Sequence, residues 1–255
     1  MVRKKASGVF DSGAGGIPVL ARAAKALPHE NFIYYADTAH FPYGDKDPEI
    51  VRDGVFKAME IMVKEGVKAA IIACNTATSV AIKELRAIYD FPILGMEPAI
   101  KPAAEQAKGK RVAVVATVLT LREKKFQELL KRCEDKENIV LLPASGLADL
   151  VEKGEYNSDK GRRFLEELFL KAGTIDSIVL GCTHYLFLLP LLKELYPAAK
   201  IIDGGEGTVR TLCHILEEKN LAAQDNGGEI HVLSSDAATF LPKFDDFYAA
   251  LTKII

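Results

Sequence analysis

Two cysteines occupy equivalent places in two similar stretches of the chain. The apolar run 68–73 leads into Cys74, the run 176–181 leads into Cys182, and polar residues follow each cysteine. Each stretch is typical of a buried strand that turns into a helix directly after the cysteine. Because α/β sheets bind ligands at the carboxyl ends of their strands, both thiols are expected in a binding cleft, where they could face each other.

These thiols could exchange protons with a ligand if their pKa values lie near neutral pH. An unperturbed thiol has a pKa of about 8.5, and a helix N-terminus with a polar neighbour lowers it. Cys74 and Cys182 both have such surroundings in the sequence, which can bring a thiol pKa near neutrality. Cys133 and Cys213 instead lie inside helical runs, which is typical of inert core cysteines.

His184 lies two residues after Cys182 and admits three interpretations. It could exchange protons with Cys182, pack in the core, or complete a Cys2His zinc set with Cys74. The four cysteines lack any Cys-x-x-Cys spacing, so we expect neither a disulfide framework nor a bound metal. Two further alternatives are a hydrolase with Cys182 as nucleophile, for which Cys74 would be dispensable, and a non-catalytic amino-acid-binding module.

A glycine-rich stretch, residues 12–16, follows Asp11 and precedes a predicted helix at 17–27. Its backbone amides and the helix N-terminus would suit a carboxylate or a phosphate. Alternatively, Asp11 and Ser12 only cap the helix. The spacing matches neither G-x-G-x-x-G nor a P-loop, so it does not support a nucleotide site.

Composition places the chain among ordinary globular proteins. Of its 255 residues, 49% are hydrophobic, and 33 Lys and Arg against 35 Asp and Glu give a net charge of −2. This balance argues against a nucleic-acid partner, which requires a basic surface. The N-terminal apolar run is too short for a signal peptide, and no stretch approaches the ~20 apolar residues that span a bilayer. We expect a cytoplasmic homodimer with no membrane partner.

Predicted strands alternate with predicted helices, a pattern typical of parallel sheets. The strands are expected at 8–11, 31–38, 68–74, 92–96, 111–117, 138–144, 177–182 and 200–203. Later helices are expected at 121–133, 147–154, 160–173, 186–196 and 208–219. A last strand at 229–234 cannot form a domain by itself, so we expect it to join the first sheet. We predict an α/β fold of two similar lobes with parallel sheets, 1–97 plus 208–255 and 98–207, with the active site in the cleft between them.

Five motifs follow one another along the chain: DSGAGG at 11–16, YADT at 35–38 with PYG at 42–44, ACNTAT at 73–78, LVEKG at 150–154 and GCTHY at 181–185. In this order they resemble the motifs of glutamate racemases, in the aspartate/glutamate racemase family. Related aspartate racemases carry glutamate where this chain has His184, which favours glutamate as the substrate. The resemblance implies racemisation of L-glutamate to D-glutamate without a cofactor, supplying bacterial peptidoglycan synthesis.

The resemblance also implies roles for residues at matching positions. Cys74 would take the α-proton from D-glutamate, and Cys182 would take it from L-glutamate. Asp11 would assist Cys74, while Glu152 and His184 would assist Cys182. Four adjacent pairs would bind the substrate: Asp11 with Ser12, Tyr43 with Gly44, Asn75 with Thr76, and Thr183 with His184. The N-terminus lacks the extension of members that a cell-wall precursor activates, so we expect no such activation.

Two thiols suit this reaction on chemical grounds. A weakly acidic α-proton must be removed next to a carboxylate and returned to the opposite face, and the sequence has no recognisable pyridoxal or metal motif. One thiolate and one thiol on opposite faces do this by general acid–base catalysis. Closure of the lobes would exclude water, while amides, hydroxyls and Asn75 would stabilise the developing negative charge.

Overall fold

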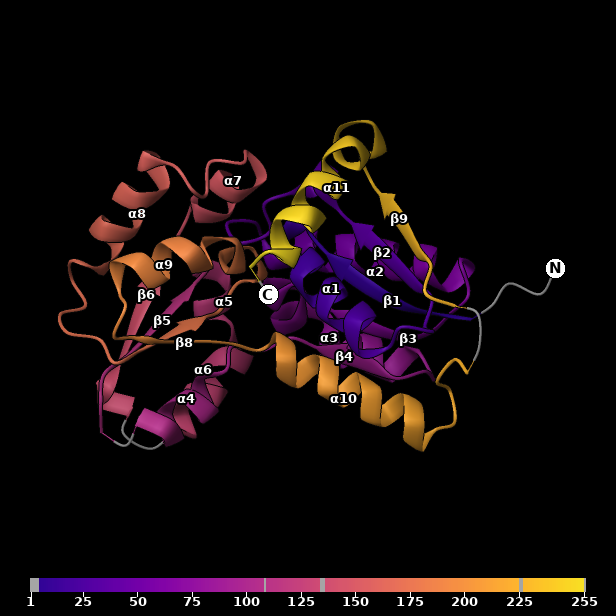
Figure 1. Cartoon of the computed structure of the whole chain (residues 1–255). Helices are drawn as coiled ribbons and strands as arrows, with labels where there is room; N and C mark the ends of the chain where they lie inside the picture. The colour runs from indigo at the N-terminus through magenta and orange to yellow at the C-terminus, as the bar shows by residue number, and fades with distance from the viewer. Residues whose placement is uncertain (1–4, 108, 134–135, 225–226, 255) are drawn as a thin grey trace.

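The computed structural model describes residues 5–107, 109–133, 136–224 and 227–254, and it contains two parallel β-sheets. The first sheet has five strands in the order β4-β3-β1-β2-β9, and the second has four in the order β6-β5-β7-β8. The paired strands run parallel in both sheets. Figure 1 shows the sheets side by side, each covered by helices. The predicted α/β fold with parallel sheets is confirmed.

The strands are apolar along most of their length because helices bury both faces of a parallel sheet. The first sheet consists of β1 (Ala6–Asp11), β2 (Phe32–Ala36), β3 (Val67–Ile72), β4 (Ile93–Gly95) and β9 (Ile230–Ser234). The second consists of β5 (Val112–Ala116), β6 (Ile139–Pro143), β7 (Ser177–Leu180) and β8 (Lys200–Asp203). Strand β9 pairs with β2, which confirms that the predicted strand at 229–234 joins the first sheet.

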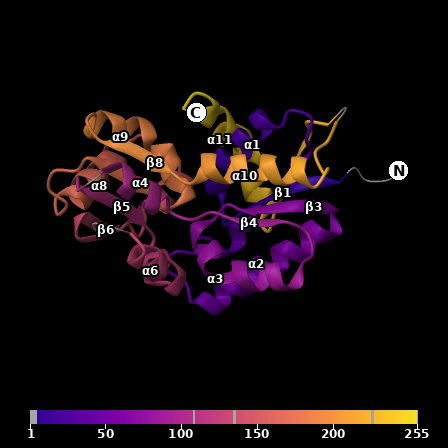
Figure 2. The ribbon, with the colours of Figure 1, turned by 90° about the horizontal axis from the view of Figure 1, so that it is seen from below.

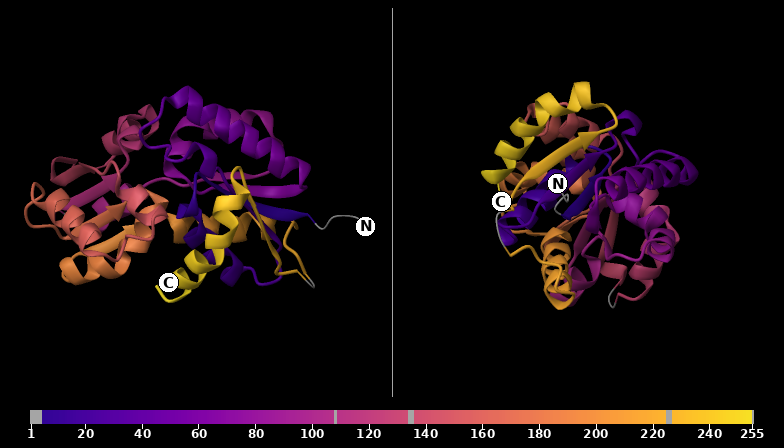
Figure 3. Two further views of the ribbon diagram at one scale, coloured as in Figure 1. Left: turned by 90° about the horizontal axis from the view of Figure 1, so that it is seen from above. Right: turned by 90° about the vertical axis from the view of Figure 1, so that its right-hand side faces the viewer.

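Helices cover both faces of the first sheet. One face carries α1 (Ile17–Ala26), α10 (Gly205–Glu218) and α11 (Ala237–Thr252), and the other carries α2 (Pro48–Lys64) and α3 (Asn75–Ile88). Figure 2 shows α10 on one side of β1 and β3, with α2 and α3 on the other, and Figure 3 shows α11 beside β9. Successive residues of a strand face opposite sides. Tyr34 of β2 therefore packs in the apolar cluster of α11, and Tyr35 packs in that of α2.

The second sheet is covered in the same way. Helices α4 (Ile100–Ala107) and α6 (Lys124–Lys131) lie on one face, and α7 (Leu147–Glu152), α8 (Asp159–Phe169) and α9 (Leu189–Leu195) lie on the other. Short elements complete the chain: α5 (Val118–Arg122), η1 (Ala14–Gly16), η2 (Thr38–His40), η3 (Lys136–Asn138) and η4 (Thr183–Leu188).

None of the helices within the described ranges combines the length and apolar character that crossing a membrane requires.

Some predicted helices were wrong in extent. The predicted helix 121–133 is two helices, α5 and α6, because Glu123 has an extended conformation between them. The predicted helix 186–196 begins as the 3-10 helix η4, and its α-helical part starts at Leu189, where a proline stands in the first turn. Helix α4 was not predicted from the sequence.

The strands that lead to the two thiols are shorter than predicted. Strand β3 ends at Ile72 and not at Cys74, and β7 ends at Leu180 and not at Cys182. Each thiol therefore lies just beyond the carboxyl end of its strand, in the turn to the next element.

Two connections join the sheets, one from β4 to α4 and one from β8 to α10. They come together at Gly204, where a Cβ atom would lie 2.5 Å from the carbonyl oxygen of Glu97. Beside them, Asp203 at the end of β8 accepts two hydrogen bonds from the Arg22 guanidinium of α1, at 2.6 and 3.1 Å. These contacts place α1, which covers the first sheet, against the end of β8 in the second sheet, beside the two connections.

A buried ion pair lies near the amino ends of the strands of the first sheet. Lys68 Nζ lies 2.9 Å from Glu30 Oε2, and the two side chains are 8% and 1% exposed. Glu30 also accepts hydrogen bonds from Ser7 Oγ at 2.8 Å and from the Ala223 amide at 3.2 Å. The ion pair and these two hydrogen bonds replace the water that the charged groups of Lys68 and Glu30 lose on folding.

Removing the cation of this pair should destabilise the fold. We expect Lys68→Ala to lower the free energy of unfolding by about 3–5 kcal/mol, because Glu30 is left buried and without its cation. Urea denaturation measures the change. Arg52→Ala is the control, because the Arg52–Glu84 pair is exposed and should contribute little. An equal loss of stability in both variants would contradict this account.

Candidate active site

Cys74 and Cys182 line one small cavity between the two sheets, and they are 6% and 8% exposed. The cavity has a volume of about 20 Å³, which is enough for a water molecule but far less than the several hundred Å³ of a usual ligand pocket. Of the residues singled out from the sequence, those that line it are Ser12, Tyr43, Gly44, Cys74, Thr76, Cys182 and His184. Asp11, Glu152, Asn75 and Thr183 are not in the lining and lie next to residues that are.

Cys74 occupies the N-cap position of α3. Its Sγ accepts a hydrogen bond from the Ala77 amide at 3.5 Å and lies 3.9 Å from Ser12 Oγ. Burial raises the pKa of the Cys74 thiol, and the charge of Asp11 adds to the rise. The lowering of the pKa that a helix N-terminus can produce is therefore outweighed at Cys74 in this closed cavity. A single amide at the helix N-terminus does not compensate for the loss of water around a thiolate.

Cys182 is linked to two further ionisable side chains. His184 Nδ1 lies 3.8 Å from Cys182 Sγ, and His184 Nε2 lies 2.8 Å from Glu152 Oε1. Burial acting alone would lower the pKa of His184, but the hydrogen bonds to Cys182 and Glu152 outweigh it and raise the pKa well above its usual value. The imidazole is thus placed where a proton can pass to or from the sulfur.

Asp11 ends β1 and has no exposed surface. Its carboxylate accepts hydrogen bonds from the Gly13 amide and the Thr183 hydroxyl, both at 2.9 Å. Burial raises the pKa of Asp11 to about 6, although the charge of His184 opposes the rise. Asp11 therefore binds to the Thr183–His184 segment, and it acts on Cys74 through its charge.

The glycine-rich loop, residues 12–16, lies directly against the second sheet's η4 and α7. A Cβ atom on Gly15 would lie 2.2 Å from His184 Nδ1, and one on Gly13 would lie 2.1 Å from Glu152 Oε1. The Ala14 amide donates to Glu152 Oε1 at 2.6 Å. The Gly13 and Ala14 amides thus bind carboxylates of the protein itself, and the Gly15 amide donates to His184 Nε2 at 3.2 Å. The glycines allow the close approach.

The loop that contains Tyr43 and Gly44 crosses from the first sheet towards the second. The Tyr43 hydroxyl donates to Asp37 at 2.5 Å, and the Gly44 carbonyl accepts from the Leu119 amide at 3.1 Å. Beside the cavity, the exposed Ser145 hydroxyl donates to Asp45 at 3.0 Å. These contacts hold the cavity closed on this side.

Neighbouring residues at the start of α3 face different surroundings. Thr76 lines the cavity, and its hydroxyl lies 3.0 Å from that of Thr117 and 3.1 Å from that of Thr120. Asn75 instead donates to the Met96 carbonyl at 3.2 Å, and its Oδ1 has no hydrogen-bond partner within the described part of the chain. Thr117 also lines the cavity, and the sequence reasoning missed it. Its place at the end of a predicted strand was the available signal.

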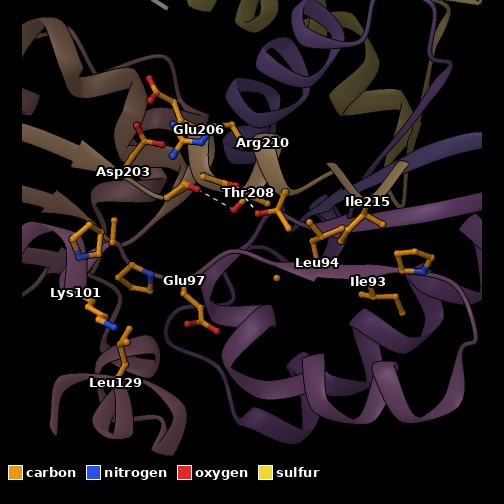
Figure 4. A pocket seen from close by; sticks show the side chains of 18 of the residues that line it. Ile93, Leu94, Glu97, Lys101, Leu129, Asp203, Glu206, Thr208, Arg210 and Ile215 are labelled. Atoms are coloured by element: carbon orange, nitrogen blue, oxygen red, sulfur yellow. Dashed lines mark hydrogen bonds between the residues drawn. The ribbon is translucent and has the colours of Figure 1, made fainter. Parts of the chain in front are cut away.

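A larger hollow of about 1280 Å³ lies beside the two connections, between β4, β8 and α10 (Figure 4). Its lining includes charged residues such as Glu97, Lys101, Glu206 and Arg210, but neither Cys74 nor Cys182. The larger hollow is therefore separate from the cavity that the two cysteines line. Within the described ranges, no group of three or more His, Cys, Asp or Glu residues is arranged to hold a metal ion.

Comparisons with known proteins agree with the motifs. The profile of the family described as Asp/Glu/Hydantoin racemase matches residues 12–212. The glutamate racemase of Clostridium botulinum strain Okra is 45% identical over 238 residues, covering 92% of this chain and 93% of its own. That of Halothermothrix orenii is 44% identical over 232 residues, covering 89% of this chain and 92% of its own. The crystal structure of Escherichia coli glutamate racemase, in complex with L-glutamate and activator UDP-MurNAc-ala, is similar with a TM-score of 0.81 at 29% identity, covering 95% of both chains.

The closed cavity should make Cys74 unreactive at neutral pH. We expect iodoacetamide at pH 7 to modify Cys74 more than about tenfold more slowly than Cys213, because one unit of pKa changes the thiolate fraction about tenfold. Mass spectrometry of the peptides measures both rates, and the two rates should become equal in concentrated urea. Faster labelling of Cys74 than of Cys213 in the native protein would show that the site stabilises the thiolate.

Proposed function

This chain belongs to the Asp/Glu/hydantoin racemase family, and on that premise we propose that it interconverts L- and D-glutamate without a cofactor, using Cys74 and Cys182 as acid and base. It is a racemase, and therefore an isomerase. The relatives named glutamate racemase, at 44–45% identity, favour glutamate as the substrate. The single observation that best supports the two-thiol mechanism is that both cysteines line the same cavity.

In the proposed reaction the α-carbon of glutamate lies between the two sulfurs. Cys182, as thiolate, removes the α-proton from L-glutamate, and the Cys74 thiol donates a proton to the opposite face to give D-glutamate. Cys182 is then protonated and Cys74 is a thiolate, so the reverse reaction starts from the state that the forward reaction leaves. No electron leaves the substrate, and one proton is removed for each proton delivered.

The surrounding groups support each sulfur differently. His184, held by Glu152, would exchange the proton of Cys182. Asp11, whose pKa is raised to about 6 by burial, would influence Cys74 through its charge. Negative charge that develops on the substrate carboxylate would be stabilised by hydroxyl and amide donors at Ser12, Tyr43, Gly44, Thr76 and Thr183. Asn75 would join them after its side chain turns from the Met96 carbonyl towards the cavity. Thr117 joins this proposed set because it lines the cavity.

The small cavity implies that the site opens to admit glutamate. We propose that the lobes 1–97 plus 208–255 and 98–207 move apart about the two connections. The Ser145–Asp45 hydrogen bond and the Leu119–Gly44 backbone bond would break in this motion and form again on closure. Opening would return water to Cys74 and lower its thiol pKa, and closing would then exclude water from the reacting carbon.

We further propose that the D-glutamate supplies peptidoglycan synthesis, that the enzyme acts in the cytoplasm, and that it is a homodimer. These proposals rest on the family and on the resemblance of the motifs. The aspartate racemase, hydrolase and binding-module alternatives are distinguished by the experiments below.

Replacing either active thiol should abolish racemisation. We expect Cys74→Ala and Cys182→Ala each to lose detectable conversion of both enantiomers, because each direction needs one sulfur as base and the other as acid. Circular dichroism at the glutamate absorption edge, or chiral chromatography, measures the conversion. Cys133→Ala and Cys213→Ala are the matched controls and should stay active. One fully active variant at position 74 or 182 would rule out the two-base mechanism.

Solvent labelling tests the substrate and the source of the proton together. After exhaustive chelation, L-glutamate in deuterium oxide should yield D-glutamate that carries deuterium at Cα, detected by NMR and chiral separation. Conversion of aspartate but not glutamate would make the enzyme an aspartate racemase. Reaction with neither amino acid would favour a hydrolase or a binding module, and activity restored by zinc would favour the metal alternative.

A further inference from the structure

Tyr34 binds the glycine-rich loop, residues 12–16, from a buried position outside the cavity. It lies in β2 with no exposed surface, and it is not among the residues that line the cavity. Its hydroxyl donates a 2.6 Å hydrogen bond to the carbonyl oxygen of Gly13. Burial raises the pKa of Tyr34 well above its usual value, so the phenol keeps its proton and remains a donor.

The Gly13 carbonyl belongs to the same peptide unit as the Ala14 amide. A peptide unit is planar, so the direction of its carbonyl sets the direction of its N–H. The Ala14 amide donates to Glu152 Oε1 at 2.6 Å, and that same oxygen lies 2.8 Å from His184 Nε2. One line of hydrogen bonds thus runs from Tyr34 through this peptide and Glu152 to His184, whose other nitrogen faces Cys182.

The ring of Tyr34 has little freedom to move. Phe240 and Phe244 of α11 pack against it, with ring centroids at 6.2 and 5.8 Å. From the loop side, a Cβ atom on Gly16 would lie 3.0 Å from the Tyr34 ring and hydroxyl. The hydroxyl is therefore fixed by packing on both sides, and it in turn fixes the peptide.

We propose that Tyr34 is a positioning residue for the Cys182 half of the reaction: it orients the Gly13–Ala14 peptide so that the Ala14 amide holds Glu152 against His184. The inference rests on the proposed racemisation. Tyr34 does not line the cavity, and it reaches the Cys182 side through the Gly13–Ala14 peptide. Loss of its hydroxyl leaves the Gly13 carbonyl buried without its donor and lets the peptide turn, which weakens the hold on Glu152.

Tyr34→Phe tests this assignment because it keeps the ring and removes only the hydroxyl. We expect kcat to fall about fivefold to tenfold with little change in KM. Because the enantiomers have equal free energies, kcat/KM must fall equally in both directions. The primary deuterium isotope effect should nevertheless become larger with α-deuterated L-glutamate than with α-deuterated D-glutamate, because only the Cys182 step is slowed.

Tyr35→Phe is the matched control, since it removes a hydroxyl from the next residue of β2, on the opposite face of the sheet. It should keep wild-type kinetics and isotope effects. Wild-type kinetics in Tyr34→Phe would overturn the proposal. A loss of activity with no difference between the two isotope effects would also overturn it, because that result indicates a general effect on the fold.

A second measurement does not depend on activity. NMR titration of His184 should show that Tyr34→Phe lowers its pKa, because Glu152 is held less firmly, whereas Tyr35→Phe leaves it unchanged. An unchanged His184 pKa in Tyr34→Phe would overturn the proposal. If the wild-type protein does not racemise glutamate, the proposed function fails, and the titration still decides whether Tyr34 positions Glu152 and His184.

Discussion

At Gly13 and Gly15 the backbone next to the first sheet comes so close to the second that a Cβ atom would lie 2.1 Å from Glu152 Oε1 or 2.2 Å from His184 Nδ1. Glycine leaves this space open, and the approach allows the Ala14 amide to reach Glu152. The same contact closes the two sheets around one cavity. Ser12 of this loop and His184 of η4 line the cavity together with the two cysteines, so the proposed chemistry depends on how closely the loop and η4 pack together.

Around that cavity, ionisable side chains depend on one another for stabilisation, because little water is present to solvate their charges. Burial raises the pKa of Asp11 to about 6 and also raises the pKa of Cys74. His184 gains more from its hydrogen bonds than it loses by burial, so its pKa rises as well. Desolvation penalises any unpaired charge, so in the proposed reaction ionisation of Cys74 would be coupled to opening of the site or to entry of a cationic group such as the substrate ammonium.

The sequence predicted the site unevenly. It placed Cys74 and Cys182 at the ends of strands, because a buried apolar run followed by polar residues is a local pattern. It could not tell which way Asn75 and Thr76 point, since successive residues at a helix start are turned about 100° from each other. Only Thr76 lines the cavity. Thr117 was missed because its place at the end of a predicted strand does not show that it will meet Thr76 and the cavity.

The sequence by itself determined the parallel α/β class, most of the strands and the family, because apolar periodicity and motif order are properties of neighbouring residues along the chain. Only the tertiary structure decided that Tyr34 binds the Gly13 carbonyl, that Ala14 binds Glu152, and that burial raises the pKa of the Cys74 thiol. These features depend on distances and on the exclusion of water between segments far apart in the sequence. Hydrogen bonding and desolvation act through space, so no local pattern records them.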